Sequence, residues 1–209
     1  MILSNIRRLA SLRSIVLASK SPRRNELLKS LGVTFKCLPS TIDERMLQNE
    51  EPVVYALRLA KAKAKSISNG LSENPSPLII GSDTIVVLGS EVLGKPTDRS
   101  DAVKILTKLS GKKHMVTTSI ALVCDKSVLS FGHESTIVHF NQVTKEQIEK
   151  YVESGESMDK AGAYGIQGMG GFLVDRIEGN LDTVIGLPCS LLEKLAGEIL
   201  DYFEESTEQ

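Results

Sequence analysis

The chain has 209 residues, of which 41% are hydrophobic and 24% charged, proportions typical of one large α/β domain or two small lobes. The formal net charge of −1 argues against a general nucleic-acid-binding protein, because such proteins carry a strongly basic surface. No apolar stretch approaches the length of a membrane span, and three scattered cysteines without a CxxC pair predict free thiols. We therefore expect a cytoplasmic protein with neither nucleic-acid nor membrane partners.

The first segment, residues 1–13, precedes any clear strand or helix pattern. It contains three arginines and no acidic residue, which gives it a faint similarity to an organelle transit peptide. Because the segment is short, we predict a frayed N-terminal extension instead. A single domain is expected over residues 14–205.

A strand followed by a helix is predicted next. The apolar run Ile15–Ala18 indicates a buried strand, and residues 25–32 have the pattern of a helix that ends at Gly32. Ser21 is a suitable N-cap for this helix, and Pro22 a suitable first helical residue. The chain should therefore turn sharply between the strand and the helix.

Two cations fall in the first turn of that helix. Arg23 and Arg24 stand where a cation is disfavoured by about 0.3–1 kcal/mol, and where exposed backbone N–H groups attract anions. With the hydroxyl of Ser19, the two guanidinium groups would form a cradle suited to phosphate. The alternative is a capped surface helix with two solvated arginines.

A second strand over residues 34–38 leads to a polar loop that contains Asp43 and Glu44. Neighbouring carboxylates offer the oxygen ligands that Mg²⁺ prefers when phosphates supply the others, although most such pairs are simply solvated. A helix is predicted from Pro52 through residue 64. Lys63 lies on this helix, where a phosphate-binding role and a place on a solvated helix face are equally compatible with the sequence. Residues 66–77 have the composition of a linker.

Asp83 lies inside an otherwise apolar predicted strand, residues 78–88. An unpaired buried carboxylate costs several kcal/mol, so this one must be paired, protonated, solvated or bound to a metal. The preceding Gly81 and Ser82 indicate a bulge or a close approach of backbone, as is common near active sites. The alternative is an aspartate at a strand end facing water.

The rest of the chain mixes helices and strands. A short strand over 91–93 completes a hairpin, and Lys95 follows it in a turn from which a cation could reach a phosphate. We predict a helix after Asp98, a central antiparallel hairpin over 115–124 and 128–140, a helix from Thr144 to Gly155, short strands over 172–177 and 181–185, and a C-terminal helix from about residue 188. This order favours a mixed α/β or α+β fold with a twisted central sheet.

Residues 159–171 form a glycine-rich block. Its glycines do not follow the GxGxxG order of dinucleotide-binding proteins, and the phosphate-loop pattern is also absent. The remaining interpretation is a tightly folded loop that presents Asp159, Lys160, Tyr164 and Gln167. An amide such as that of Gln167 can both donate to and accept from the edge of a base.

Taken together and in order, these segments resemble the Maf family of nucleoside triphosphate pyrophosphatases. The matching segments are Leu17–Arg24, Asp43–Glu44, Ala60–Ala64, Ser82–Val86, Gly94–Pro96, Leu109–Gly111, Ser154–Glu156, Asp159–Gly168 and Gly186–Pro188. They span nearly the whole chain. The glycine-rich block resembles that of the branch that acts on dTTP and UTP.

The resemblance implies a hydrolase that splits nucleoside triphosphates, including modified pyrimidine nucleotides, into the monophosphate and pyrophosphate. It implies two lobes around a long twisted central mixed sheet with a substrate cleft, similar to the inosine triphosphatase fold, and a possible homodimer. Asp83 would be the proton acceptor, and Glu44 with Asp83 would hold Mg²⁺ or Mn²⁺. The substrate-binding residues would be Ser19, Arg23, Arg24, Lys63, Thr84, Lys95, Lys160 and Gln167.

Two other classes of function remain open from the residues alone. A nucleotide-sensing regulator of cell division would bind the triphosphate without hydrolysing it. A nucleotidyl or kinase-type transferase would need an acceptor substrate.

Overall fold

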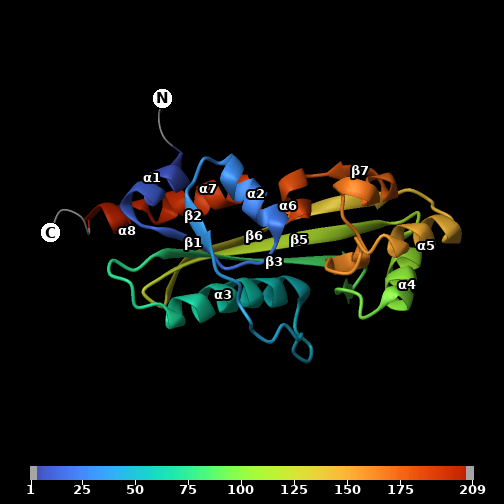
Figure 1. Ribbon diagram of the computed structural model, residues 1–209, viewed down its shortest axis with the longest axis horizontal. Helices are drawn as coiled ribbons and strands as arrows, with labels where there is room; N and C mark the ends of the chain where they lie inside the picture. Colours follow the sequence, from blue (N-terminus) through green and yellow to red (C-terminus); the bar gives the residue numbers. More distant parts are fainter. Residues whose placement is uncertain (1–3, 206–209) are drawn as a thin grey trace. The chain divides into compact units, whose positions relative to one another are not determined.

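The computed structural model describes residues 4–205, along which helices and strands are interspersed (Figure 1). The strands are β1 (Ile15–Leu17), β2 (Phe35–Cys37), β3 (Leu78–Leu88), β4 (Glu91–Leu93), β5 (Lys113–Cys124), β6 (Ser127–Phe140) and β7 (Val174–Glu178). The helices are α1 (Asn5–Leu12), α2 (Pro22–Ser30), α3 (Pro52–Gly70), α4 (Arg99–Leu109), α5 (Lys145–Glu153), α6 (Leu181–Ile185), α7 (Cys189–Glu198) and α8 (Leu200–Glu205), with the short 3-10 helices η1 (Ala161–Ala163) and η2 (Gly168–Leu173) in the glycine-rich block. No helix among the described residues combines the length and the apolar character that crossing a membrane requires.

The strands form one mixed sheet in the order β2-β1-β3-β5-β6-β7, with β4 paired to β3. The pairs β1–β2 and β1–β3 are parallel, whereas β3–β4 and β6–β7 are antiparallel. The two-residue turn Asp125–Lys126 joins β5 to β6 with positive φ at both positions, the geometry that favours a tight hairpin. The predicted mixed α/β fold with a central mixed sheet is confirmed.

The chain forms two compact units. One contains the residues up to Asp83, residues 118–134 and the residues from Gly186 onward, and the other contains residues 84–117 and 135–185. Strands β3, β5 and β6 each contribute residues to both units.

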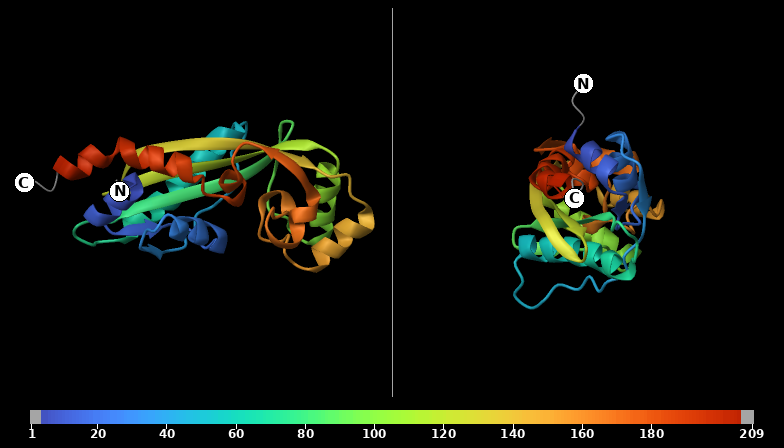
Figure 2. Two further views of the ribbon diagram at one scale, coloured as in Figure 1. Left: turned by 90° about the horizontal axis from the view of Figure 1, so that it is seen from above. Right: turned by 90° about the vertical axis from the view of Figure 1, so that its left-hand side faces the viewer.

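In the first unit, the strands are covered by helices on both faces (Figures 1 and 2). Ile15 and Leu17 of β1 belong to the core shared with α1, α2, α7 and α8, whereas Val16 and Ala18 pack with Ala64 of α3. Successive side chains of a strand point to opposite faces, so a strand buried on both faces appears as a continuous apolar run. This explains the unbroken apolar sequence of β1.

The second unit has a separate core beneath α4 and α5. Leu106 of α4 and Val152 of α5 pack with Val116 of β5 and Val138 of β6. The Thr144 side chain caps α5 by accepting from the backbone N–H of Gln147, as predicted from the sequence. The second unit therefore has a hydrophobic core of its own.

The N-terminal segment differs from its prediction as a frayed extension. Residues 5–12 form α1, whose Ile6 and Leu9 are fully buried in the core of the first unit. The backbone N–H of Asn5 donates to Glu193 Oε2 of α7 at 2.8 Å, and the Asn5 side chain donates to the Glu193 carbonyl at 3.1 Å. Tertiary contacts with α7 stabilise a helix that is too short to persist alone.

Two further segments differ from the sequence-based expectation. Residues 181–185 form helix α6, and the predicted linker begins only after α3 has continued to Gly70. The backbone N–H of Lys126 donates to the Ser68 hydroxyl at 3.0 Å, which ties this last turn of α3 to the β5–β6 turn. The cysteines are free thiols as predicted, with Cys124 buried and Cys37 exposed.

Candidate active site

The close packing of α3 on β3 sets the position of Asp83. A Cβ atom on Gly81 would lie 2.1 Å from the Ala60 carbonyl oxygen, so only glycine allows this approach of helix to strand. Asp83 follows two residues later on the same face of β3, and Lys63 lies almost one turn beyond Ala60 on α3. The backbone contact therefore brings the lysine beside the carboxylate.

Lys63 joins two carboxylates in the first unit. Its Nζ lies 2.6 Å from Asp83 Oδ1 and 2.8 Å from Glu44 Oε1. The Lys63 and Asp83 side chains are each 9% exposed, whereas that of Glu44 is 41% exposed. The alternative of a solvated helix face for Lys63 is therefore wrong, and the sequence-predicted Glu44, Lys63 and Asp83 form one cluster.

The ionisation of Asp83 is shaped by opposing effects. Burial raises the pKa of its carboxyl, while the positive charges of Lys63 and Arg24 lower it in part. A buried carboxylate held beside cations can stay ionised and still bind a proton more readily than an exposed one. The net effect is that the pKa of Asp83 lies above the ordinary value of an aspartate.

Glu44 is presented by a loop that is fastened to α3. The Tyr55 hydroxyl donates to the Glu44 carbonyl oxygen at 2.7 Å. Arg58 donates to both carboxylate oxygens of Glu50, at 2.6 and 2.7 Å, and to the Arg45 carbonyl oxygen at 3.0 Å. The loop is therefore fixed at Glu44 and at two residues that follow it, the bidentate contact with Glu50 being the strongest geometry of these.

Asp43, the neighbour of Glu44 in the predicted acidic pair, is engaged elsewhere. Its carboxylate accepts from the backbone N–H, Nε and Nη2 of Arg45, at 2.6–3.1 Å. These hydrogen bonds lower the pKa of this exposed carboxyl. The two adjacent acids therefore have different surroundings, and only Glu44 contacts Lys63.

On the other face of β3, Arg24 and Ser82 share one acceptor. Arg24 Nε donates to the Gly186 carbonyl oxygen at 2.8 Å, and the Ser82 hydroxyl donates to the same oxygen at 2.9 Å. Burial lowers the pKa of the Arg24 guanidinium, and the charge of Asp83 opposes that shift. Arg24 thus connects α2, β3 and the segment before α7.

The strand-to-helix turn is built as predicted. The Ser21 side chain accepts from the Arg24 backbone N–H at 3.4 Å, and Pro22 is the first residue of α2. Ser19 is buried, and its hydroxyl accepts from the Ser21 backbone N–H at 3.1 Å. Arg23, partly exposed, lies in the first turn of α2. This turn offers the helix N-terminus and hydroxyls that favour an anion.

The other predicted substrate residues belong to the second unit. The backbone N–H of Gly162 donates to the Gly94 carbonyl oxygen at 3.0 Å, which places the turn of Lys95 beside the glycine-rich block. Lys160 Nζ donates to the Glu156 carbonyl oxygen and to Asp159 Oδ1, the latter at 2.6 Å. Gln167 is exposed, and Thr84 lies next to Asp83 in β3.

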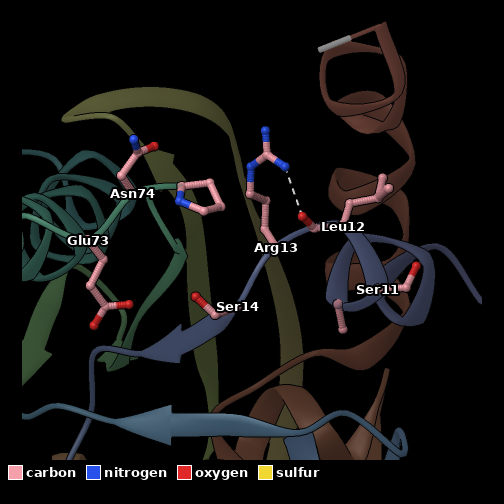
Figure 3. A pocket seen from close by; sticks show the side chains of 8 residues that line it. Ser11, Leu12, Arg13, Ser14, Glu73 and Asn74 are labelled. Atoms are coloured by element: carbon pink, nitrogen blue, oxygen red, sulfur yellow. Dashed lines mark hydrogen bonds between the residues drawn. The ribbon is translucent and has the colours of Figure 1, made fainter. Parts of the chain in front are cut away.

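A pocket of about 490 Å³ lies elsewhere in the first unit (Figure 3). Residues 10–14 and 73–75 line it, at the amino ends of β1 and β3. Ser19 follows the carboxyl end of β1, where ligands of parallel α/β sheets usually bind. The pocket contains none of the sequence-predicted site residues.

Comparison with known families decides the classification. A family model described as "Maf-like protein" matches residues 14–199. The chain belongs to the Maf family.

Individual relatives cover most of the chain. The dTTP/UTP pyrophosphatase of Aquifex aeolicus is 46% identical over 185 residues, which are 88% of this chain and 95% of that protein. The dTTP/UTP pyrophosphatase of Shewanella denitrificans is 49% identical over 179 residues, covering 83% and 89%. Among solved structures, a HAM1 protein from Coxiella burnetii is 21% identical, with a TM-score of 0.41 over 63% of this chain and 74% of that chain, a similarity too low to bear on the argument.

The acidic residues of this Maf protein suit a divalent cation. Glu44 and Asp83 already share one cation, the ammonium group of Lys63, and both offer carboxylate oxygen. Within residues 4–205 no group of three or more His, Cys, Asp or Glu side chains could hold a metal ion. Mg²⁺ is usually bound by one or two protein carboxylates, with phosphate and water as its other ligands.

Sequence reasoning did not identify Tyr55 or Glu156 as site residues. The signal for Tyr55 was weak, a single aromatic hydroxyl in a predicted helix of aliphatic and basic residues. Glu156 belongs to the segment Ser154–Glu156 that carries the Maf resemblance, so it could have been singled out.

Proposed function

We propose that this chain hydrolyses dTTP and UTP, and modified pyrimidine nucleoside triphosphates, to the monophosphate and pyrophosphate, using Mg²⁺ or Mn²⁺. The observation that carries the proposal is the cluster of the buried Asp83 and Lys63 with the partly exposed Glu44 in a Maf protein. Its support is that relatives named dTTP/UTP pyrophosphatase match this chain at 46% and 49% identity.

In this proposal Asp83 is the general base. Its carboxylate takes a proton from a water molecule while the water oxygen bonds to the α-phosphorus and the bond from that phosphorus to the α–β bridging oxygen breaks. Pyrophosphate leaves with the bonding electron pair, and the nucleoside monophosphate remains. Lys63 contacts Asp83 through Oδ1, so we assign the proton to the second oxygen, Oδ2.

The negative charge of three phosphates must be neutralised during this attack. A divalent cation held by Glu44 and Asp83 would supply Lewis-acid stabilisation of the phosphate oxygens. Lys63, already between these carboxylates, is placed to donate to a phosphate when its carboxylate contacts loosen. Arg23, Arg24, Ser19 and the N-terminus of α2 provide further cationic and N–H groups.

We assign recognition of the base to Gln167 and its neighbours. Uracil and thymine share a carbonyl, N3–H, carbonyl edge, which an amide and backbone groups can match, whereas cytosine reverses two of these positions. Thr84, Lys95 and Lys160 are proposed as further substrate-binding residues on the resemblance to the Maf family.

The test is product identification with a panel of substrates. The protein is incubated with UTP, dTTP, CTP or GTP and Mg²⁺, and nucleotides and phosphates are separated by ion-exchange chromatography. We expect monophosphate and pyrophosphate in equal amounts from the first turnover, with UTP and dTTP preferred. Diphosphate and orthophosphate as first products would exclude the proposal, and stabilisation by UTP without pyrophosphate release would indicate a nucleotide sensor.

A further inference from the structure

The carboxylate of Glu156 holds the glycine-rich block from one side. Glu156 Oε2 accepts from the Met169 backbone N–H at 3.0 Å, and Oε1 accepts from the Gly170 backbone N–H at 3.2 Å. Hydrogen bonds to an ionised acceptor are among the stronger ones in proteins. Two consecutive amides of the loop therefore depend on one side chain that precedes them by 13 and 14 residues.

Tyr151 of α5 extends this contact to a third point of the loop. Its hydroxyl donates to Glu156 Oε1 at 3.1 Å and accepts from the Gly165 backbone N–H at 3.1 Å. Tyr151 is 2% exposed, and Gly165 is buried, so this N–H depends on the hydroxyl as its partner. The network fixes the backbone on both sides of Gln167, at Gly165 and at Met169.

The packing within the block leaves little freedom for another arrangement. A Cβ atom on Gly170 would lie 2.3 Å from the Gly165 carbonyl oxygen and 2.9 Å from the Tyr151 hydroxyl. The two ends of the segment around Gln167 are thus in direct backbone contact, while Gln167 itself is exposed. An exposed side chain on a rigidly held backbone is the arrangement expected of a recognition residue.

We propose that Glu156 is a positioning residue for nucleotide recognition, which directs the Gln167 amide toward the base by fixing the backbone from Gly165 to Gly170. This inference rests on the proposed function. It assigns Glu156 no contact with the substrate and no role in proton transfer. Its prediction is therefore a change in preference among bases, with turnover of the best substrate largely kept.

The first test compares Glu156→Gln with Glu153→Gln. The glutamine at 156 keeps one carbonyl oxygen but presents an NH₂ group where the second carboxylate oxygen accepts from a backbone N–H. Glu153 is an exposed acid at the end of α5, just before Glu156 in the chain, so its substitution removes the same charge without touching the loop. We expect the kcat/KM ratio of UTP over CTP to fall about tenfold in Glu156→Gln, with kcat for UTP little changed, and to stay constant in Glu153→Gln.

The second test does not use activity. Hydrogen exchange should become faster, by about tenfold, in peptides covering residues 165–171 of Glu156→Gln, and stay unchanged in peptides from β3 and β5. Unchanged exchange in the loop would overturn the structural part of the inference. Faster exchange across the whole protein would show that Glu156 serves overall stability instead.

A double-mutant cycle then links Glu156 to Gln167. If Glu156 acts through Gln167, Glu156→Gln should not lower the UTP preference further in a Gln167→Ala background. Additive effects of the two substitutions, or an unchanged ratio in Glu156→Gln, would overturn the inference while the proposed function stands. Absence of pyrophosphate release by the unmodified protein would instead contradict the proposed function, and the exchange measurement would still test the loop.

Discussion

The carboxyl group of Asp83 is buried beside the ammonium group of Lys63. Because asparagine has the same shape as aspartate, the substitution Asp83→Asn separates the chemical role of this side chain from its structural role. We expect Asp83→Asn to lower kcat for UTP by about 10²–10⁴-fold, because the amide cannot accept the proton of water. Asparagine keeps a carbonyl oxygen for Lys63, which also retains Glu44 at 2.8 Å. Urea unfolding of the same samples should therefore show little loss of stability.

The matched control for this substitution is Asp43→Asn. Asp43 is exposed and contacts Arg45, so neutralising it removes an acid from the same region without touching Lys63. We expect turnover to stay near that of the unmodified protein. If Asp83→Asn kept full turnover and lost stability, Asp83 would be a structural residue.

His114 gives the second unit a defined dependence on pH. Burial lowers the pKa of His114 from 6.5 to about 4, and its Nε2 lies 2.7 Å from the Tyr164 hydroxyl. The unfolded protein then binds a proton more readily than the folded one, so this contribution to stability is present above pH 6.5 and is lost as the pH falls toward 4. At about 1.4 kcal/mol for each pKa unit, the full effect is on the order of 3 kcal/mol.

The measurement is urea unfolding of the unmodified protein and His114→Gln between pH 7 and pH 4.5. The glutamine can still hydrogen-bond to Tyr164 but does not titrate, so the decline in unfolding free energy below pH 6.5 should be shallower in the variant. His133→Gln, at an exposed position, should follow the unmodified protein. Identical slopes for all three proteins would mean that His114 is not buried as a neutral imidazole.

At the scale of elements, α1 is the one whose role departs most from the sequence-based expectation. Leu9 of α1 is fully buried in the core of the first unit, so Leu9→Ala should lower the unfolding free energy by about 2–5 kcal/mol. If residues 5–12 were a frayed extension, this substitution would leave the unfolding free energy unchanged. Urea unfolding distinguishes the two, with the exposed Ser11→Ala as the control that should change little.

The elements that the sequence predicted well are those with local signals. Ser21 and Thr144 cap their helices with side-chain hydrogen bonds, and the turn at Asp125–Lys126 joins two long alternating strands. Helices α1 and α6 were missed because their sequences are short, and contacts with the remainder of a unit decide their conformation. Ile6 and Leu9 alone define no amphipathic repeat until α7 is present to cover them.

At the scale of the whole molecule, the mixed sheet could be predicted because strand and helix patterns alternate irregularly along the chain. Asp83 could be singled out because a carboxylate in an apolar strand needs a partner. The partner itself could not be deduced, since Lys63 comes 20 residues earlier and reaches Asp83 only through the Gly81–Ala60 approach. The support that Tyr55 and Glu156 give to their loops likewise depends on tertiary contacts.

In the proposed reaction, water attacks the α-phosphorus of a pyrimidine nucleoside triphosphate. The most direct test is hydrolysis of UTP with Mg²⁺ in water enriched in ¹⁸O, followed by mass spectrometry of both products. Attack at the α-phosphorus places one ¹⁸O atom in UMP and none in pyrophosphate, and this is the predicted result. Label found in pyrophosphate, or in orthophosphate released with UDP, would place the attack on another phosphorus and exclude the proposed reaction.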